Sequence, residues 1–247
     1  SVSAVSLPLR NLSAMSVSVS VEGIHRTSLI DYPGRVAAVV FLGGCNLRCR
    51  FCHNAPLFSS SGQHGELSKQ LFEYLERRKG LVDGVVVSGG EPLLADNAVD
   101  FIRQLKATGL PVKLDTNGAY PEKLQQICEE KLADYVAMDV KTSPEKYAEL
   151  CGAPVFDRLE KSLDVLRRQG MTYELRTTCV PGYVDEHILA AIGERFGQVD
   201  RYYLQQFVPA MAFDSTMHSM EPFHPDRMSM MLDVVRSFSG ECALRGV

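Results

Sequence analysis

The sequence predicts an α/β protein, a partial (βα)6 TIM-like barrel with parallel strands, on three observations. Short apolar runs alternate with amphipathic stretches along the 247-residue chain. The runs around Val39 and Val86 are continuously apolar, which is typical of strands covered on both faces. Polar and glycine-rich segments follow five of the predicted strands, at the edge where parallel α/β folds bind their ligands. An open, doubly wound sheet would fit the same alternation.

Six candidate strands are short, apolar or β-branched, and bounded by Gly, Pro, Asp or Asn. They cover residues 35–42, 84–88, 111–115, 135–140, 172–178 and 201–207. Apolar residues at helical spacing fill the gaps, over 66–79, 96–109, 121–132, 159–166, 188–196 and 228–235. This alternation predicts six βα units joined by right-handed crossovers.

Composition excludes several classes of function. A net charge of −4 argues against broad electrostatic binding to nucleic acid or to an anionic membrane. No apolar run approaches the roughly 20 residues of a membrane span. Residues 1–20 are rich in serine and lack the apolar core of a secretory signal, so we expect a flexible N-terminal tail. Residues 21–247 then form one domain, and we expect a cytoplasmic protein.

Three cysteines, Cys45, Cys49 and Cys52, follow the first predicted strand in a CxxxCxxC pattern. A structural zinc site needs four ligands, and the chain has no second cysteine pair. A redox CxxC formed by Cys49 and Cys52 leaves Cys45 unexplained. Three thiolates could instead hold three irons of an iron–sulfur cluster and leave the fourth iron open for a ligand. We expect the other cysteines to be small buried apolar residues: Cys128, Cys151, Cys179 and Cys242.

This cysteine pattern, with Phe51 before its last thiol and SGGEP at 88–92 one βα unit later, resembles the radical S-adenosylmethionine superfamily. Four further segments resemble the glycyl-radical-enzyme activases of that superfamily: CHN at 52–54, DTNG at 115–118, DVK at 139–141 and RxxxVPG at 176–182. Residues 27–57 are most similar to the activating proteins of anaerobic ribonucleoside-triphosphate reductase.

The resemblance implies catalytic and cofactor-binding roles for these motifs. The three cysteines would ligate a 4Fe–4S cluster, and the amino and carboxylate groups of S-adenosylmethionine would bind its open iron. Gly89 and Gly90 would let the backbone approach the methionine moiety, and Glu91 would add a polar contact. Phe51 would lie near adenine, and Asn117 would belong to the same cofactor site.

The resemblance also implies a charged group around the cofactor. Asp115, Thr116 and Asp139 resemble residues that surround a monovalent cation near the cofactor carboxylate in pyruvate formate-lyase activase. Lys141 and Arg176 would orient the carboxylate and ribose of S-adenosylmethionine. Taken without the resemblance, Asp115 and Asp139 would more simply be helix caps.

One departure concerns the adenine contact. Pyruvate formate-lyase activase has a histidine near adenine after its last strand, and the stretch LQQFVPA at 204–210 has none. Gln206 and Phe207 are candidate substitutes. Before Pro144, Ser143 is expected to cap a helix.

The implied activity is reductive cleavage of S-adenosylmethionine, after which the 5′-deoxyadenosyl radical takes hydrogen from a glycine of a partner protein. The implied partner is a glycyl radical enzyme, anaerobic ribonucleotide reductase, with a flavodoxin or ferredoxin-type reductant. Two alternatives stay open. One is a radical enzyme for a small molecule, resembling 7-carboxy-7-deazaguanine synthase, and the other is a non-catalytic iron–sulfur module.

Overall fold

A computed structural model describes residues 19–59 and 65–247. Most of the expected N-terminal tail, residues 1–18, lies outside the described residues. Val19 and Ser20, which end that segment, are buried, and the Ser20 carbonyl accepts a hydrogen bond from the Gly43 N–H.

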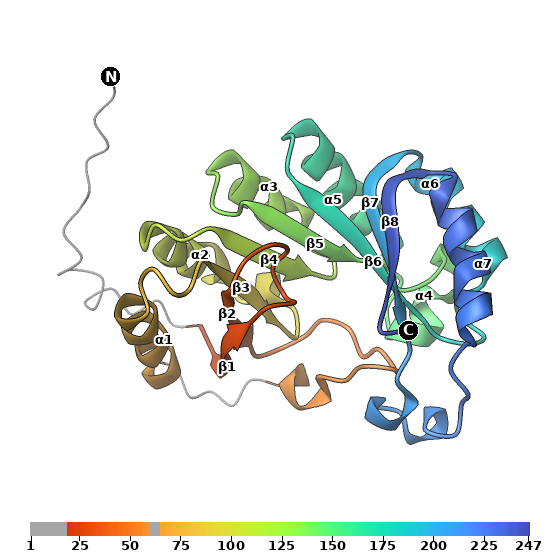
Figure 1. Cartoon of the computed structure of the whole chain (residues 1–247), viewed down its shortest axis with the longest axis horizontal. Coiled ribbons are helices and arrows are strands. Elements are labelled where there is room, and N and C mark those ends of the chain that lie inside the picture. The colour runs from red at the N-terminus through yellow and green to blue at the C-terminus, as the bar shows by residue number, and fades with distance from the viewer. Residues whose placement is uncertain (1–18, 60–64) are drawn as a thin grey trace.

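One eight-stranded sheet organises the described part of the chain, with its strands in sequence order (Figure 1). The strands are β1 (Val21–Ser28), β2 (Ala37–Leu42), β3 (Gly84–Gly89), β4 (Val112–Thr116), β5 (Tyr135–Asp139), β6 (Tyr173–Cys179), β7 (Val199–Gln206) and β8 (Ser239–Arg245). Strands β2 to β8 are parallel, and β1 pairs antiparallel with β2. The six crossovers between the seven parallel strands confirm the predicted βα units. Among the described residues β1 and β8 are the edges of the sheet, so the barrel is open.

The two edge strands were not predicted from the sequence. Strand β1 has three exposed residues near its end, and β8 has no buried residue. Each lacks the apolar run that marks the inner strands, because an edge strand of the open barrel has a neighbour on one side only and is less covered.

In the part of the chain that the structure describes, seven α-helices follow the strands, and most of them cover the convex face of the sheet (Figure 1). They are α1 (Glu66–Arg77), α2 (Ala98–Ala107), α3 (Pro121–Glu129), α4 (Pro144–Cys151), α5 (Phe156–Arg168), α6 (Glu186–Phe196) and α7 (Pro225–Arg236). Helix α4 begins where a helix start was predicted, at Pro144, although its extent was not predicted. Ser143 stands at its N-cap position, but the Ser143 side chain makes no capping hydrogen bond. Gly152 ends α4 in the left-handed conformation, with φ of 81°.

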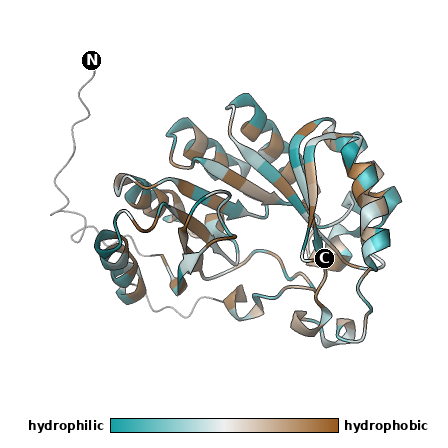
Figure 2. Cartoon of the chain, viewed as in Figure 1, coloured by the Kyte–Doolittle hydropathy of each residue, from teal (hydrophilic) through white to brown (hydrophobic). Residues whose placement is uncertain are grey.

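The two faces of the sheet have different surroundings. On the convex face, Val40, Val87 and Leu114 pack against the helices in the main core. On the interior face, Val39 and Val86 pack with Tyr32 and Tyr135 in a smaller cluster. Figure 2 shows the apolar residues concentrated along the strands. The smaller cluster leaves the carboxyl ends of the strands for polar side chains.

Candidate cluster and cofactor site

The cysteine loop, residues 43–54, directly follows β2 and is fixed by its backbone. The Arg48 N–H donates to the Cys151 carbonyl at 2.8 Å, and the Arg50 N–H donates to the Leu150 carbonyl at 3.0 Å. These two bonds hold the residues on either side of Cys49 against the carboxyl end of α4. Cys49 is buried, whereas Cys45 and Cys52 are partly exposed.

The surroundings of the three thiols differ. A hydrogen bond from the Cys151 thiol, together with Lys141, holds the pKa of Cys49 below its ordinary value. Burial raises the pKa of Cys45 to about 11 and also raises the pKa of Cys52. Iron binds the thiolate form, so assembly of a cluster on this loop must release protons, and burial opposes ionisation of Cys45 and Cys52.

The three thiols of the loop lie near one another. The three are close enough that the charges of Cys49 and Cys52 help to raise the pKa of Cys45. Nowhere in residues 19–59 and 65–247, however, do three or more His, Cys, Asp or Glu side chains surround a position for one metal ion. In a 4Fe–4S cluster each thiolate binds a different iron, so the loop's donor set suits that group.

Gly89 and Gly90 allow the end of β3 to lie against the cysteine loop. A Cβ on Gly89 would come within 2.2 Å of the Leu42 carbonyl oxygen, and one on Gly90 within 2.1 Å of the Gly44 carbonyl oxygen. Gly89 also has a φ of 133°, which side chains disfavour. The sequence motif is therefore required by contact between two backbone segments; its approach to the methionine moiety stays a prediction.

Glu91 connects the strand-end loops to each other. Its side chain is buried and accepts hydrogen bonds from the Leu93 N–H (3.0 Å), the Thr116 hydroxyl (2.8 Å) and the Asn117 N–H (2.6 Å). Burial raises the pKa of Glu91 to about 7 despite these donors. The Asn117 amide in turn donates to the Asn46 side chain in the cysteine loop at 2.8 Å. Glu91, Thr116 and Asn117 thus fix the DTNG loop relative to the cysteines.

Asp115 and Asp139 belong to a network of ion pairs at the carboxyl ends of β4, β5 and β6. Arg176 lies between them, with its Nε 2.8 Å from Asp139 and its Nη1 3.3 Å from Asp115. Lys141 Nζ lies 2.7 Å from Asp139, and Lys113 pairs with Asp115. Burial would raise the pKa of Asp139, but Arg176 and Lys141 outweigh it and lower that pKa to about 2. The helix-cap interpretation of the two aspartates is therefore wrong.

The three residues considered for the adenine contact differ in their surroundings. Phe51 is buried, with Lys141 Nζ 5.7 Å from its ring centroid. Gln206 donates from Nε2 to the Phe223 carbonyl at 2.7 Å. Phe207 is 1 % exposed and packs in the main core, so it has no free face to offer adenine.

Two residues of this site were not assigned to it from the sequence. Cys151 is buried, as expected, but its thiol contacts Cys49, a tertiary contact with no sequence signal. Lys113 precedes Asp115 by two positions in a strand, and this spacing places both on one face. That spacing was the available signal for Lys113.

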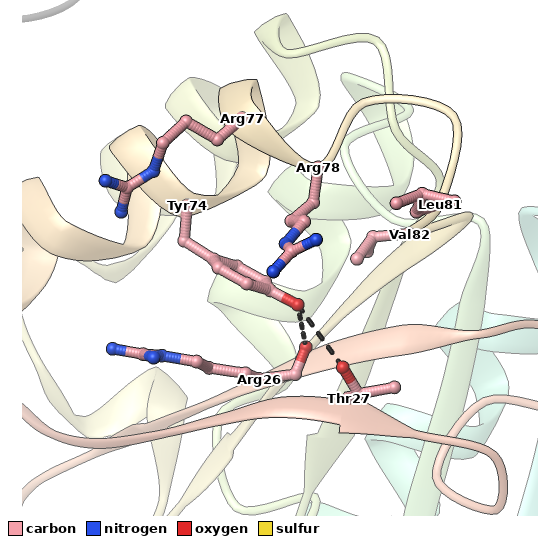
Figure 3. A pocket seen from close by; sticks show the side chains of 7 residues that line it. All are labelled: Arg26, Thr27, Tyr74, Arg77, Arg78, Leu81 and Val82. Atoms are coloured by element: carbon pink, nitrogen blue, oxygen red, sulfur yellow. Dashed lines mark hydrogen bonds between the residues drawn. The ribbon is translucent and has the colours of Figure 1, made fainter.

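A separate hollow of about 890 Å³ lies between β1 and α1 (Figure 3). Arg26, Arg77 and Arg78 line it, and the Tyr74 hydroxyl donates to the Arg26 carbonyl at 2.7 Å. The neighbouring Ser28 pairs with the first residue of β2, whereas the cysteine loop follows the last. The hollow is therefore at the opposite edge of the sheet from the cysteines.

The described part of the chain includes no helix of the length and apolarity that a membrane crossing needs.

An open parallel barrel with a three-cysteine loop at its carboxyl edge defines an iron–sulfur enzyme of the partial-barrel class. Residues 39–194 match the family model of the radical SAM superfamily. The chain belongs to that superfamily, and membership implies a 4Fe–4S cluster and S-adenosylmethionine as cofactors.

Relatives of the chain confirm the resemblance to glycyl-radical-enzyme activases. A protein of Methanocaldococcus jannaschii named as a putative glycyl-radical enzyme activating enzyme is 38% identical over 78% of this chain and 82% of its own length. The pyruvate formate-lyase 1-activating enzyme of Escherichia coli is 28% identical over 77% of this chain and 81% of its own length.

Solved structures show the same fold at low identity. A radical SAM methyltransferase from Sphaerobacter thermophilus superposes with a TM-score of 0.69 at 14% identity, covering 87% of this chain and 67% of its own. QueE from Escherichia coli gives a TM-score of 0.57 at 14% identity, covering 97% and 99% of the two chains. These likenesses concern the fold alone.

Proposed function

We propose that this radical SAM enzyme takes a hydrogen atom from a glycine of a glycyl radical enzyme, anaerobic ribonucleotide reductase. The observation that carries the proposal is the cysteine loop at the open carboxyl edge of the sheet, in a chain 38% identical to a protein named as an activating enzyme. The similarity of residues 27–57 to the reductase-activating proteins supports this particular partner.

In this proposal Cys45, Cys49 and Cys52 hold the cluster, which with S-adenosylmethionine supplies the radical chemistry. Arg176 and Lys141 present positive charge for the cofactor carboxylate and ribose, and the two aspartates hold these cations in place. The GGE and DTNG segments fix the backbone around the cofactor. A flavodoxin or ferredoxin-type protein supplies the electron, in the cytoplasm.

Exposed apolar side chains beside the cysteine loop support a protein as the substrate. Met211 and Phe213 follow β7 and are 57% and 53% exposed. The Phe213 ring packs edge-on against Phe58 at 5.0 Å. This segment is also joined to the loop, because the Asp214 N–H donates to the Arg50 carbonyl at 2.8 Å. Large exposed apolar groups at a rim are typical of protein-binding surfaces.

The test is anaerobic reconstitution with iron and sulfide, reduction, and assay of 5′-deoxyadenosine and of the glycyl-radical doublet by electron paramagnetic resonance. We expect the doublet on anaerobic ribonucleotide reductase and none on a reductase whose radical glycine is replaced by alanine. The Cys52→Ser variant should give neither product nor doublet.

Three other outcomes would redirect the proposal. A doublet on pyruvate formate-lyase instead would keep the activase and change its partner. Cleavage of S-adenosylmethionine with no doublet on either enzyme would favour a small-molecule substrate. An intact cluster with no 5′-deoxyadenosine would leave the non-catalytic iron–sulfur module.

A further inference from the structure

Lys113 is a buried cation in the interior of the open barrel. Its side chain is 2% exposed, and its ammonium contacts Asp115 Oδ1. In the sheet Lys113 pairs with Val86 on β3 and with Tyr135 on β5, both members of the apolar interior cluster. A lysine is rarely placed among such residues unless its charge is used.

The carboxylates beside Lys113 already have all the cationic partners that their charges require. Asp115 and Asp139 carry two negative charges, and Lys113, Lys141 and Arg176 carry three positive charges. Each of the four carboxylate oxygens contacts one of these cations. Glu174, a further carboxylate whose charge acts on Arg176, is paired with Arg245. An added monovalent ion would therefore be a fourth positive charge beside Asp115 and Asp139.

Thr116, the third residue implied in cation binding, also uses its hydroxyl for hydrogen bonds within the protein. Its hydroxyl donates to Glu91 at 2.8 Å and accepts a hydrogen bond from the Gly118 N–H at 3.1 Å. The residue is 2% exposed. The donor set that the resemblance implies for a monovalent cation therefore does not fit one here.

We propose that Lys113 replaces the monovalent cation, as a positively charged side chain built into β4 beside Asp115. A tethered ammonium has the same charge as K⁺ and is present in every folded molecule, so the site is complete at any salt composition. Lys113 is a positioning residue: it shares the charge of Asp115 with Arg176, whose guanidinium also pairs with Asp139. This inference rests on membership of the superfamily and is independent of the partner enzyme.

The first test uses the wild-type protein without any partner. Binding of S-adenosylmethionine to the reconstituted enzyme is measured in KCl, NaCl and choline chloride at equal ionic strength. We expect dissociation constants that agree within about twofold, since no exchangeable ion takes part. A saturable strengthening by K⁺ of about tenfold or more would overturn the proposal.

The second test removes the ammonium and retains most of the side-chain volume. The Lys113→Met variant should bind S-adenosylmethionine at least about tenfold more weakly in choline chloride, because Asp115 loses a buried partner. Potassium should restore that binding in a saturable way. It should also raise the thermal unfolding midpoint of the cluster-free variant, which the wild type should not show. Lys161→Met, on the exposed surface of α5, is the matched control.

The two tests decide together. A folded Lys113→Met protein whose binding stays weak in KCl would refute replacement of an ion by Lys113. If this variant does not fold, the wild-type salt series decides alone. Neither measurement includes a glycyl radical enzyme, so the activase proposal can fail while this one stands, and the reverse.

Discussion

Replacing Glu91 with glutamine removes a buried carboxylate at constant size and should change how stability depends on pH. Burial raises the pKa of Glu91 in the folded protein from 4.5 to about 7. Below the lower value the carboxyl is protonated in both the folded and unfolded states. As pH rises toward 7, the unfolded chain releases this proton first, so the free energy of unfolding falls.

The size of this effect follows from the two pKa values. Each pH unit between them contributes about 1.4 kcal/mol, so the loss from Glu91 is about 3 kcal/mol once the folded carboxyl is ionised. Glutamine does not titrate. We therefore expect the free energy of unfolding of Glu91→Gln, relative to wild type, to rise by about 3 kcal/mol between pH 4.5 and about pH 8.

The assay is urea unfolding of the cluster-free protein, followed by circular dichroism across this pH range. We also expect a difference in unfolding free energy between variant and wild type that does not depend on pH. Glutamine has one carbonyl oxygen for the three hydrogen bonds that the two oxygens of Glu91 accept. Glu76→Gln, on the exposed face of α1, is the control and should follow the wild type. If the difference in unfolding free energy between Glu91→Gln and wild type changes by less than about 1 kcal/mol over this pH range, the raised pKa of Glu91 is refuted.

Three further substitutions probe the cysteine loop. Gly90→Ala places a Cβ about 2.1 Å from a loop carbonyl and should abolish most cluster loading, measured as bound iron and sulfide. Cys151→Ala should keep the cluster but shift its reduction potential to a more negative value in an electron paramagnetic resonance titration, because Cys49 loses a hydrogen bond that favours the reduced state. Asp214→Asn breaks the 2.7 Å pair with Arg50, whose side chain is 35% exposed, and should lower the free energy of unfolding only slightly in urea titration.

A different result would contradict each of these three predictions. Normal iron content in Gly90→Ala would mean that the loop can move away from β3. An unchanged potential in Cys151→Ala would mean that the thiol only fills space. A large loss of unfolding free energy in Asp214→Asn would show that this partly exposed pair is coupled to the fold of the loop.

The inner strands and most helices follow from local pattern. The predicted segments 111–115 and 172–178 differ by one residue at each end from β4 and β6. Helix α5 buries Leu159, Leu163 and Leu166, as their spacing predicts. These elements are predictable because a buried face imposes its period on the sequence. Strand β8 has no buried face to impose a period and was not predicted. Helix α4 buries Tyr147, Leu150 and Cys151 at helical spacing, but only its start, after Ser143, was predicted.

Strand order predicts which residues of the candidate site share one edge of the sheet, but not the contacts between its loops. Parallel topology alone brings Asp115, Asp139 and Arg176 to one edge, and the structure joins them as ion pairs. The contact between Cys151 and Cys49 depends on how α4 packs on the cysteine loop, which strand order does not determine. Likewise, the hydrogen bond from the Asn117 N–H to Glu91 depends on the conformation of the loop after β3, which strand order does not determine.

The backbone bonds that fix the cysteine loop bear on how the enzyme survives air. Zinc fingers lose their fold with their metal, because the metal supplies most of their stability. Here the peptide groups of Arg48 and Arg50 are bonded to the end of α4 by the polypeptide itself. Oxygen that destroys the cluster should therefore leave a folded protein with its three thiols still near one another. Damage of this kind is repairable, because the same polypeptide can rebuild its cluster from iron and sulfide more than once.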